Sequence, residues 1–408
     1  MNLQKYSIAF FALAGFVALA TIACGGETSP TSTPTQISVE ARQTQIASTP
    51  QPTNTPAVVI VTPTPIPLPI YGDGILEVHD ASGWLNSDEF KITEKTAENQ
   101  VVLVDFWTYT CVNCLRTLPF LKEWQAKYSD RGLVILGVHT PEFEFEKEIE
   151  NVREAIQREG IEWPVVLDND FGTWNSFSNR FWPAKYLIGV DGQLRYQHFG
   201  EGAYVEVEQE IRDALTEAGH DISDIPIGTI NDADRDPVAN SVTRKLYGGY
   251  ERNYNQNGIY AGQEDYYIEP DATRLYTDIA TYTPQQWFIQ GLWTNGPESI
   301  IHARETANLE DHIAFYFAGR SANVVLSPSK TESFNVYIEL DDRPLTSDEA
   351  GLDIEFDDEG RSYIKVDEPR LYAIIETPEF GEHIVKLSSN SDDFAIFAFT
   401  FGINESGI

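Results

Sequence analysis

The sequence predicts an α/β sandwich domain followed by an all-β domain of the sandwich or jelly-roll type. Between residues 71 and 219, short apolar strands alternate with helical patterns and end in a hairpin, which is typical of an α/β fold. From residue 241 to 408, short β-rich runs recur at irregular intervals with turn residues between them. The polar, Asp-rich stretch 220–240 separates the two patterns and is predicted to be a linker.

The elements of the α/β domain follow in order from their hydrophobic patterns. A buried strand is a short continuous apolar run, whereas a surface helix has apolar residues at every third or fourth position. The dipeptide Asp191-Gly192 between two strand-like runs marks a hairpin. On these grounds we expect strands at 100–107, 132–139, 164–168, 185–190 and 194–198, and helices at 115–128, 142–159 and 206–218.

Short apolar runs also predict the strands of the all-β domain. They lie at 287–293, 312–317, 324–326, 334–340, 370–375, 383–387 and 394–399. Four aromatic residues in this part, Trp287, Trp293, Tyr247 and Tyr250, have rings that can stack on a sugar. They indicate either a glycan-binding platform or ordinary packing in the core of the sandwich.

The first 24 residues have the layout of a secretory signal, with Lys5 before an apolar run that ends at Cys24. The stretch Thr21-Ile22-Ala23-Cys24 resembles a bacterial lipobox, which implies that Cys24 is lipidated and becomes the mature N-terminus. An uncleaved membrane anchor and plain secretion are the alternatives, and all three place the remainder outside the cytoplasm. Residues 25–70 are rich in Thr, Pro, Ser and Gln and are predicted to form a disordered stalk.

Charge and cysteine content narrow the classes of function. The 408-residue chain has a formal net charge of -35, which makes nucleic acid a poor partner because its phosphate backbone is also negative. The chain has three cysteines, Cys24, Cys111 and Cys114. Once Cys24 is lipidated, the other two remain as a pair.

This pair, Cys111-Val112-Asn113-Cys114, follows a buried strand and opens a helix. The free N–H groups of a helix N-terminus stabilise a thiolate, which is the nucleophile in thiol–disulfide exchange. We expect Cys111 to attack a substrate disulfide and Cys114 to resolve the mixed disulfide, without any other cofactor. A zinc site would need two further ligands, and a structural disulfide across so short a loop would contribute little stability.

The sequence around this pair resembles the thioredoxin superfamily. The similarity rests on Val104-Asp105-Phe106-Trp107, on the Cys-x-x-Cys pair three residues later and on Pro119 in the following helix. It implies that Asp105 is a buried proton acceptor for the resolving thiol. It also implies that Pro183, in Phe181-Trp182-Pro183-Ala184, forms a cis peptide bond that faces the cysteines and exposes backbone groups to the substrate.

The spacing between Cys114 and Pro183 resembles the TlpA/ResA-like branch of this superfamily. The stretches 137–143, 168–174, 182–188 and 198–202 look like the extracytoplasmic part of DipZ proteins, which in those proteins is followed by a carbohydrate-binding-type domain. DipZ proteins carry a membrane domain that delivers electrons, and in its place this chain has the predicted lipid anchor and stalk. This departure from DipZ means that the electrons come from another protein, with a membrane donor of the CcdA or DipZ type expected, or that the thioredoxin-like domain is not kept reduced at all.

Several further residues are candidates for the substrate-binding surface. We expect Trp107, Tyr109 and Trp182 to surround the cysteines, with core packing as the alternative for Trp107, and we expect Val112 and Asn113 to tune the redox potential. His139 has either a role near the redox site or a structural one.

The leading hypothesis is a membrane-anchored oxidoreductase that reduces disulfides of exported proteins. One alternative is a glycan- or partner-binding surface lipoprotein whose redox domain is accessory. The other is a thiol peroxidase, because Thr108 and Cys111 have the spacing of a Thr-x-x-Cys motif, although the second cysteine argues against it.

Overall fold

A computed structural model describes residues 76–228, 242–253, 258–330 and 333–403. The predicted signal, Cys24, the stalk at 25–70 and most of the predicted linker lie outside these residues. No helix in the described ranges is both long enough and apolar enough to cross a membrane.

The α/β domain is built on a six-stranded mixed sheet with the order β1-β4-β3-β2-β5-β6. Strands β2, β3 and β4 are parallel to one another, and β1, β5 and β6 are each antiparallel to their neighbours. The strands are β1 (Gly83–Leu85), β2 (Val101–Trp107), β3 (Leu133–His139), β4 (Val165–Leu167), β5 (Ala184–Ile188) and β6 (Leu194–Phe199). The helices are α1 (Ile92–Ala97), α2 (Val112–Tyr128), α3 (Ile149–Glu159), α4 (Gly172–Ser176) and α5 (Tyr204–Glu217).

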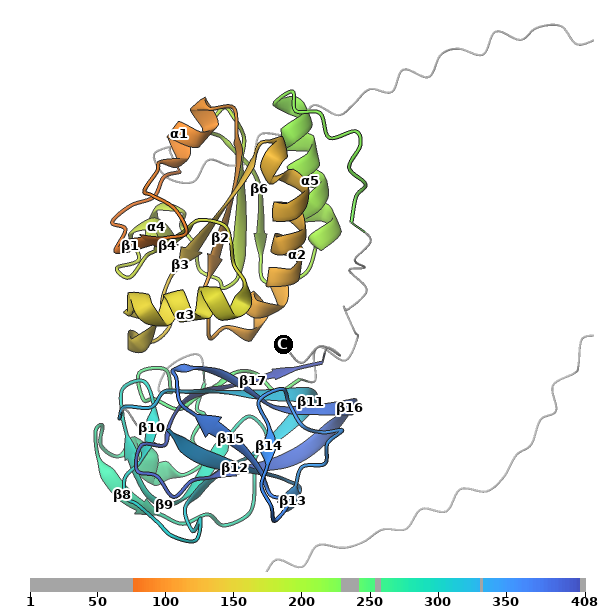
Figure 1. The fold of residues 1–408 in the computed structure, drawn as a ribbon. Helices are drawn as coiled ribbons and strands as arrows, with labels where there is room; N and C mark the ends of the chain where they lie inside the picture. The colour runs from red at the N-terminus through yellow and green to blue at the C-terminus, as the bar shows by residue number, and fades with distance from the viewer. Residues whose placement is uncertain (1–75, 229–241, 254–257, 331–332, 404–408) are drawn as a thin grey trace, which may run out of the picture. The chain divides into compact units, whose positions relative to one another are not determined.

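Helices cover both faces of this sheet, which explains why its central strands are apolar throughout (Figure 1). Val101 and Leu103 of β2 pack in one apolar cluster with residues of α2, α3 and α5. Val102 and Val104 point the other way and pack with residues of α1 and α4. Asp105 shares the face of Val101 and Leu103, because side chains alternate along a strand, and so it lies on the side of α2.

The all-β domain is a larger sheet in which two long strands carry most of the pairing. The first half of β11 (His312–Leu326) pairs with β9 and its second half pairs with β17. Strand β11 also pairs with the second long strand, β16, with a register shift between Gly319 and Ser321. The other strands are β7 (Leu246–Tyr247), β8 (Thr273–Tyr276), β9 (Trp287–Asn295), β10 (Ile300–His302), β12 (Phe334–Leu340), β13 (Arg343–Pro344), β14 (Glu355–Phe356), β15 (Ser362–Val366), β16 (Arg370–Ser388) and β17 (Ala395–Gly402). The predicted fold class, an α/β domain followed by an all-β domain, is therefore confirmed.

Two local predictions were wrong in ways that have a physical cause. The runs 312–317 and 324–326 belong to one strand, as do 370–375 and 383–387, because irregular pairing lets a strand bend without ending. The predicted helix 142–159 begins only at Ile149, after a short 3-10 helix at Glu144–Lys147. Of the two alternatives stated for Trp287 and Trp293, core packing holds, because both side chains are fully buried and cannot form a glycan platform.

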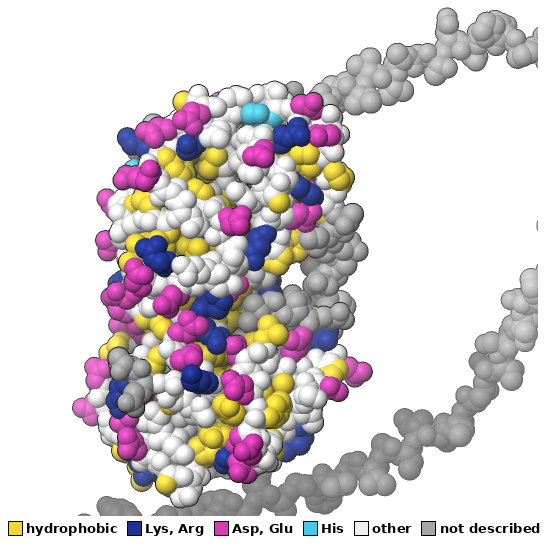
Figure 2. Space-filling view, viewed as in Figure 1, with side chains coloured by type: hydrophobic (Ala, Val, Ile, Leu, Met, Phe, Trp, Pro, Cys, Tyr) yellow, Lys and Arg dark blue, Asp and Glu magenta, His cyan; other side chains and the backbone are white. Residues whose placement is uncertain are grey.

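The first part of the predicted linker packs on the α/β domain. Ile222 is buried, and the guanidinium of Arg131 donates to the backbone oxygen of Asp221 at 2.7 Å and forms an ion pair with Asp224 at 2.8 Å. The segment 220–228 therefore continues the fold after α5. Figure 2 shows Asp and Glu side chains spread over the visible face of both domains, with Lys and Arg between them.

The two domains are in contact through apolar and aromatic side chains. Val325, Leu371 and Ala398 of the all-β domain join the apolar cluster formed by α2, α3 and α5. The ring of Phe397 lies 5.3 Å from that of Phe143 and 4.9 Å from that of Phe145. These contacts place strand β17 beside the loop that follows β3, which is also the edge where α2 begins.

Candidate redox site

Cys111 is the N-cap residue of helix α2, and its sulfur is partly exposed. The backbone N–H of Cys114 donates a hydrogen bond to the Cys111 sulfur over 3.3 Å, and Cys111 has the extended backbone conformation of an N-cap. Both cysteines are free thiols. The positive end of the helix therefore points at the sulfur that solvent can reach, which is the arrangement that activates a cysteine nucleophile.

Cys114 lies one turn further into the helix and is completely buried. Burial raises the pKa of the Cys114 thiol well above its usual value, and the neighbouring Cys111 and the charge of Asp105 raise it further. Cys114 thus stays protonated while Cys111 reacts. Its thiol needs a nearby group to accept its proton before it can attack in turn.

Asp105 forms a buried ion pair, and it is near enough to Cys114 for its charge to raise the pKa of that thiol. Its carboxylate lies 2.9 Å from the ammonium of Lys185, and the two side chains are only 2% and 1% exposed. The pair forms because the two residues are register partners on the adjacent antiparallel strands β2 and β5. Burial raises the pKa of Asp105, although the charge of Lys185 acts in the opposite direction.

The Trp182–Pro183 peptide bond is cis. Trp182 is partly exposed, its indole N–H donates to the backbone oxygen of Thr140 at 3.1 Å, and its ring lies 4.2 Å from that of Trp174. These contacts fix the indole of Trp182, which lines the same pocket as Cys111.

Of the aromatic residues expected to surround the cysteines, Tyr109 lies in the core instead, and Trp107 follows its core-packing alternative. Trp107 and Tyr109 are each 1% exposed, so neither can contribute to a substrate-binding surface. Both rings pack against His139, with Tyr109 stacked on it at 5.5 Å and Trp107 edge-on at 5.4 Å. Burial lowers the pKa of His139 to about 3, which keeps its imidazole neutral. His139 is a packed core residue with its Nε2 atom 3.3 Å from the Thr108 hydroxyl.

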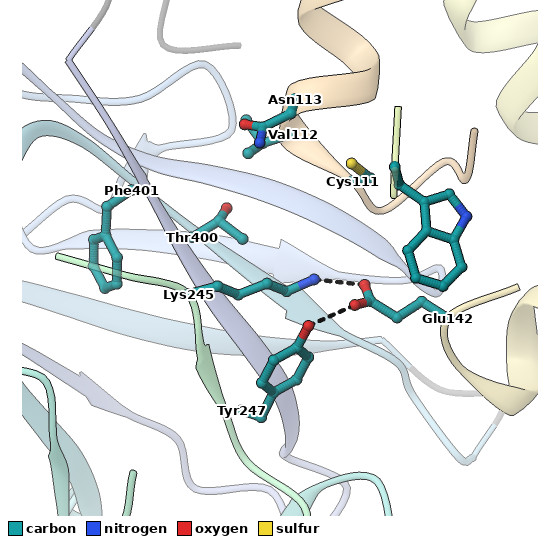
Figure 3. A pocket seen from close by; sticks show the side chains of 9 residues that line it. Cys111, Val112, Asn113, Glu142, Lys245, Tyr247, Thr400 and Phe401 are labelled. Carbon is teal, nitrogen blue, oxygen red and sulfur yellow. Dashed lines mark hydrogen bonds and ion pairs between the residues drawn. The ribbon is translucent and has the colours of Figure 1, made fainter. Parts of the chain in front are cut away.

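A cavity of about 230 Å³ opens at Cys111 between the two domains. On the α/β side its lining includes the predicted residues Val112, Asn113 and Trp182. On the other side four residues of the all-β domain complete it, and Figure 3 shows them across the cavity from the start of α2. These four residues are Lys245, Tyr247, Thr400 and Phe401.

The floor of this cavity is a cluster of charged residues around Glu142. The carboxylate of Glu142 accepts hydrogen bonds from Lys245 at 2.5 Å and from the Tyr247 hydroxyl at 2.7 Å (Figure 3), and a third from Arg252 at 2.9 Å. Burial acts to raise the pKa of Glu142, but the two cations outweigh it and bring that pKa below its usual value. Burial, assisted by Glu142, raises the pKa of Tyr247 to about 12.

A second carboxylate, Glu146, supports this cluster from the α/β side. It accepts from the Thr110 hydroxyl at 2.6 Å and from the backbone N–H groups of Glu142 at 2.5 Å and Phe143 at 3.0 Å. Glu146 therefore ties Thr110, the residue before Cys111, to the loop that follows β3 at Glu142 and Phe143. Within the described ranges, no group of three or more His, Cys, Asp or Glu side chains is arranged to hold a metal ion.

Sequence reasoning missed Lys185, Glu142 and the residues of the all-β domain that line the pocket. Lys185 had a visible signal, because it is a lysine within an apolar strand two residues after Pro183. Glu142 was assigned to a charged surface helix, and its burial depends on cations that lie more than a hundred residues later in the chain.

Comparisons with known proteins agree with this architecture. Residues 81–211 match the family described as Redoxin, and residues 243–402 match the family described as thioredoxin-like C-terminal domain. Protein DipZ of Mycobacterium bovis is 40% identical over 182 residues, which are 44% of this chain and 26% of DipZ. This chain thus spans about a quarter of the length of the DipZ relatives that it matches.

Smaller relatives match the α/β domain alone. Thiol-disulfide oxidoreductase YkuV of Bacillus subtilis is 27% identical over 141 residues, which are 35% of this chain and 93% of YkuV. A solution structure of a thioredoxin-like protein in its oxidised form is 26% identical, covers 35% of this chain and 95% of its own, and has a TM-score of 0.32. The chain therefore contains one region that matches the Redoxin family and a later one that matches the thioredoxin-like C-terminal domain family, and it is homologous to DipZ and to thiol–disulfide oxidoreductases such as YkuV.

Proposed function

We propose that this chain is an extracytoplasmic, membrane-anchored thiol–disulfide oxidoreductase that reduces disulfides of exported proteins through Cys111 and Cys114. The observation that carries the proposal is the contrast between the two sulfurs. Cys111 is accessible at a helix N-terminus and is contacted by a backbone N–H group, whereas Cys114 is buried and has a raised pKa. This contrast separates the attacking thiol from the resolving thiol.

The reaction consists of two thiol–disulfide exchanges. Together they pass two electrons from the Cys111–Cys114 dithiol to the substrate disulfide. The Cys111 thiolate attacks one sulfur of the substrate disulfide, forms a mixed disulfide and releases the other substrate sulfur as a thiol. Cys114 then loses its proton and attacks the Cys111 sulfur, which releases the second substrate thiol and leaves a Cys111–Cys114 disulfide. A reductant outside this chain must return two electrons and two protons before the next cycle.

Asp105 is the proposed acceptor for the proton of Cys114. It lies on the face of the sheet that carries α2, and its charge is one of the causes of the raised pKa of Cys114. Lys185 keeps the carboxylate paired within the apolar core at 2.9 Å. Lys185 is therefore a positioning residue, whereas Asp105 moves the proton.

The location and the electron source are also part of the proposal. The signal-like run before Cys24 supports lipidation of that cysteine, and the composition of residues 25–70 supports a stalk that holds the folded domains away from the membrane. We propose that a membrane protein of the CcdA or DipZ type delivers the electrons. Replacing Cys24 with Ala should release the full chain from the membrane fraction, and a chain that stays bound would indicate another anchor.

The central test is disulfide reduction by the full chain with dithiothreitol as the electron source. Cys111→Ser should abolish turnover, and Cys114→Ser should accumulate a mixed disulfide between Cys111 and the substrate that is visible on a non-reducing gel. If the Cys111→Ser variant keeps full turnover, Cys111 is not the nucleophile.

The direction of electron flow is tested by the reduction potential of the Cys111–Cys114 pair. A potential near that of thioredoxin, about -270 mV, is expected for a reductase. A potential near about -120 mV would make the protein an oxidant of exported thiols instead.

A further inference from the structure

The face of the all-β domain that meets the redox site carries polar residues where an apolar interface would be expected. Side chains alternate along β11 and β17, so Val324 and Phe399 pack in the core of the all-β domain, whereas Val325 and Ala398 join the cluster of the α/β domain. The positions that share the face of Val325 and Ala398 are Ser321, Asn323, Thr400 and Gly402. Two hydroxyls and an amide thus lie between the domains.

These polar groups are buried without partners. Asn323 and Ser321 are 0% exposed and Thr400 is 5% exposed. In the described part of the chain, both polar atoms of the Asn323 amide, the Ser321 hydroxyl and the Thr400 hydroxyl have no hydrogen-bond partner. Buried polar groups in folded proteins are nearly always paired, so four such atoms on one patch indicate that something else pairs with them.

The patch adjoins the reactive sulfur. Thr400 lines the cavity at Cys111 together with Val112 and Asn113 (Figure 3). Its register partner on the neighbouring strand is Asn323, which is fully buried and is not among the residues that line the cavity. Directly opposed residues on antiparallel strands have side chains close enough to contact each other. At the end of the patch, a side chain at Gly402 would collide with Arg116 of helix α2, so the two domains approach closely there.

The shape of the cavity limits what can enter it. Its volume of about 230 Å³ lies below the range of about 300–1,000 Å³ that is usual for pockets holding whole small ligands. The bonds from Lys245, Tyr247 and Arg252 to Glu142 tie its two walls together. A narrow segment of chain fits such a slot better than the surface of a folded protein.

We propose that Thr400 binds the peptide backbone beside the substrate cysteine and that Asn323, its buried neighbour, supports this contact, so that the all-β domain selects disulfides in extended polypeptide segments. A threonine hydroxyl can pair with the N–H or the C=O of a peptide group, and a carboxamide beside it offers that hydroxyl both a donor and an acceptor. The inference rests on the proposed function, because it assigns the substrate of the Cys111 site.

The test compares two disulfides in reactions catalysed by the full chain. One is an unstructured peptide whose two cysteines are joined by a disulfide, and the other is cystamine, which has no peptide group. Thr400→Val and Asn323→Leu preserve side-chain size and remove the polar groups. Each should lower the ratio of kcat/KM for the peptide to that for cystamine by about three- to tenfold, the effect of one lost hydrogen bond, mainly through KM.

Two controls make the outcome decisive. Neither variant should lower the thermal midpoint, because the free protein loses no hydrogen bond at these atoms. Thr294→Val, which removes a hydroxyl paired with Thr273 at 2.7 Å on a distant part of the domain, should leave the ratio unchanged. An unchanged ratio in Thr400→Val and Asn323→Leu would overturn the inference and indicate that only buried water pairs with the patch. A wild-type chain that reduces neither disulfide would instead refute the proposed function.

Discussion

The two walls of the cavity at Cys111 are built in different ways. On the α/β side, Cys111, Val112 and Asn113 are consecutive residues at the start of one helix, so their positions follow from local structure. On the all-β side, Lys245 and Thr400 lie more than 150 residues apart and meet only because β7 pairs with β17. The reactive chemistry is therefore local in the sequence, whereas the shape of the site depends on long-range pairing.

The same contrast holds for two buried carboxylates of the site, Asp105 and Glu142. Asp105 is paired with Lys185 within one sheet, and both side chains are excluded from solvent. Glu142 is paired with Lys245 and Arg252 of the other domain, and these cations remain 26% and 37% exposed. Because desolvation makes an unpaired charge costly, the two pairs should respond differently when one partner is removed.

The largest effect is expected beneath the cysteines. Lys185→Met leaves the Asp105 carboxylate buried without a counter-charge, and breaking such a pair costs about 3–5 kcal/mol of unfolding free energy. Urea denaturation of the full chain measures the loss. A combined Lys185→Met and Asp105→Leu variant should recover most of it, since an apolar pair of similar size needs no compensation. If Lys185→Met alone is as stable as wild type, Asp105 carries no charge in the folded protein.

A smaller loss is expected between the domains. Glu142→Gln keeps the size of the side chain but removes the charge that Lys245 and Arg252 share, and it should cost about 1–3 kcal/mol because the cations can still reach water. The folded pKa of Glu142 lies below its ordinary value of 4.5, so its contribution is complete above that pH and is lost as the pH falls through the folded value. The difference between wild type and variant should therefore shrink below about pH 4.5. A difference that is constant between pH 7 and pH 3 would contradict this account of Glu142.

The part of the site that could be predicted is the part that local pattern determines. The apolar run of β2, the Cys111–Cys114 spacing and the position of Pro183 before a hairpin are all readable within a few residues. Hydrophobic pattern also separated an α/β part from a β-rich part, because helix and strand periods differ.

The rest could not be predicted because it arises from pairing between distant segments. Nothing near Glu142 in the sequence distinguishes it from the exposed glutamates around it, such as Glu144. Trp107 and Tyr109 were assigned to the surface because aromatic residues beside a reactive cysteine fit a binding face equally well, and only the packing of His139 against both rings shows that they are core. The unpartnered Asn323 became visible only once its register with Thr400 was known.

The pH dependence of the unfolding free energy should show that His139 is buried and neutral in the folded protein. Its folded pKa is about 3, and its ordinary value is 6.5, so between these pH values the unfolded chain binds a proton that the folded chain does not. Stability should therefore fall as the pH decreases from about 6.5 towards 3, by at most about 1.4 kcal/mol per pH unit from this one group. In His139→Gln this slope should be shallower than in wild type. Equal slopes measured by urea denaturation at pH 7, 6, 5 and 4 would show that His139 is charged or exposed in the folded protein.

The smallest effect is expected at the exposed rim of the interface between the domains. Arg158 and Glu368 form an ion pair at 3.1 Å across it, but their side chains are 33% and 31% exposed, so water screens the attraction. The coupling energy between Arg158→Gln and Glu368→Gln, taken from a double-mutant cycle in urea, should not exceed about 1 kcal/mol and should vanish in about 1 M salt. A coupling as large as the loss in Glu142→Gln would mean that charge anywhere on the interface holds the domains together. A negligible coupling would assign that role to the buried cluster around Glu142, which lies against the redox cavity itself.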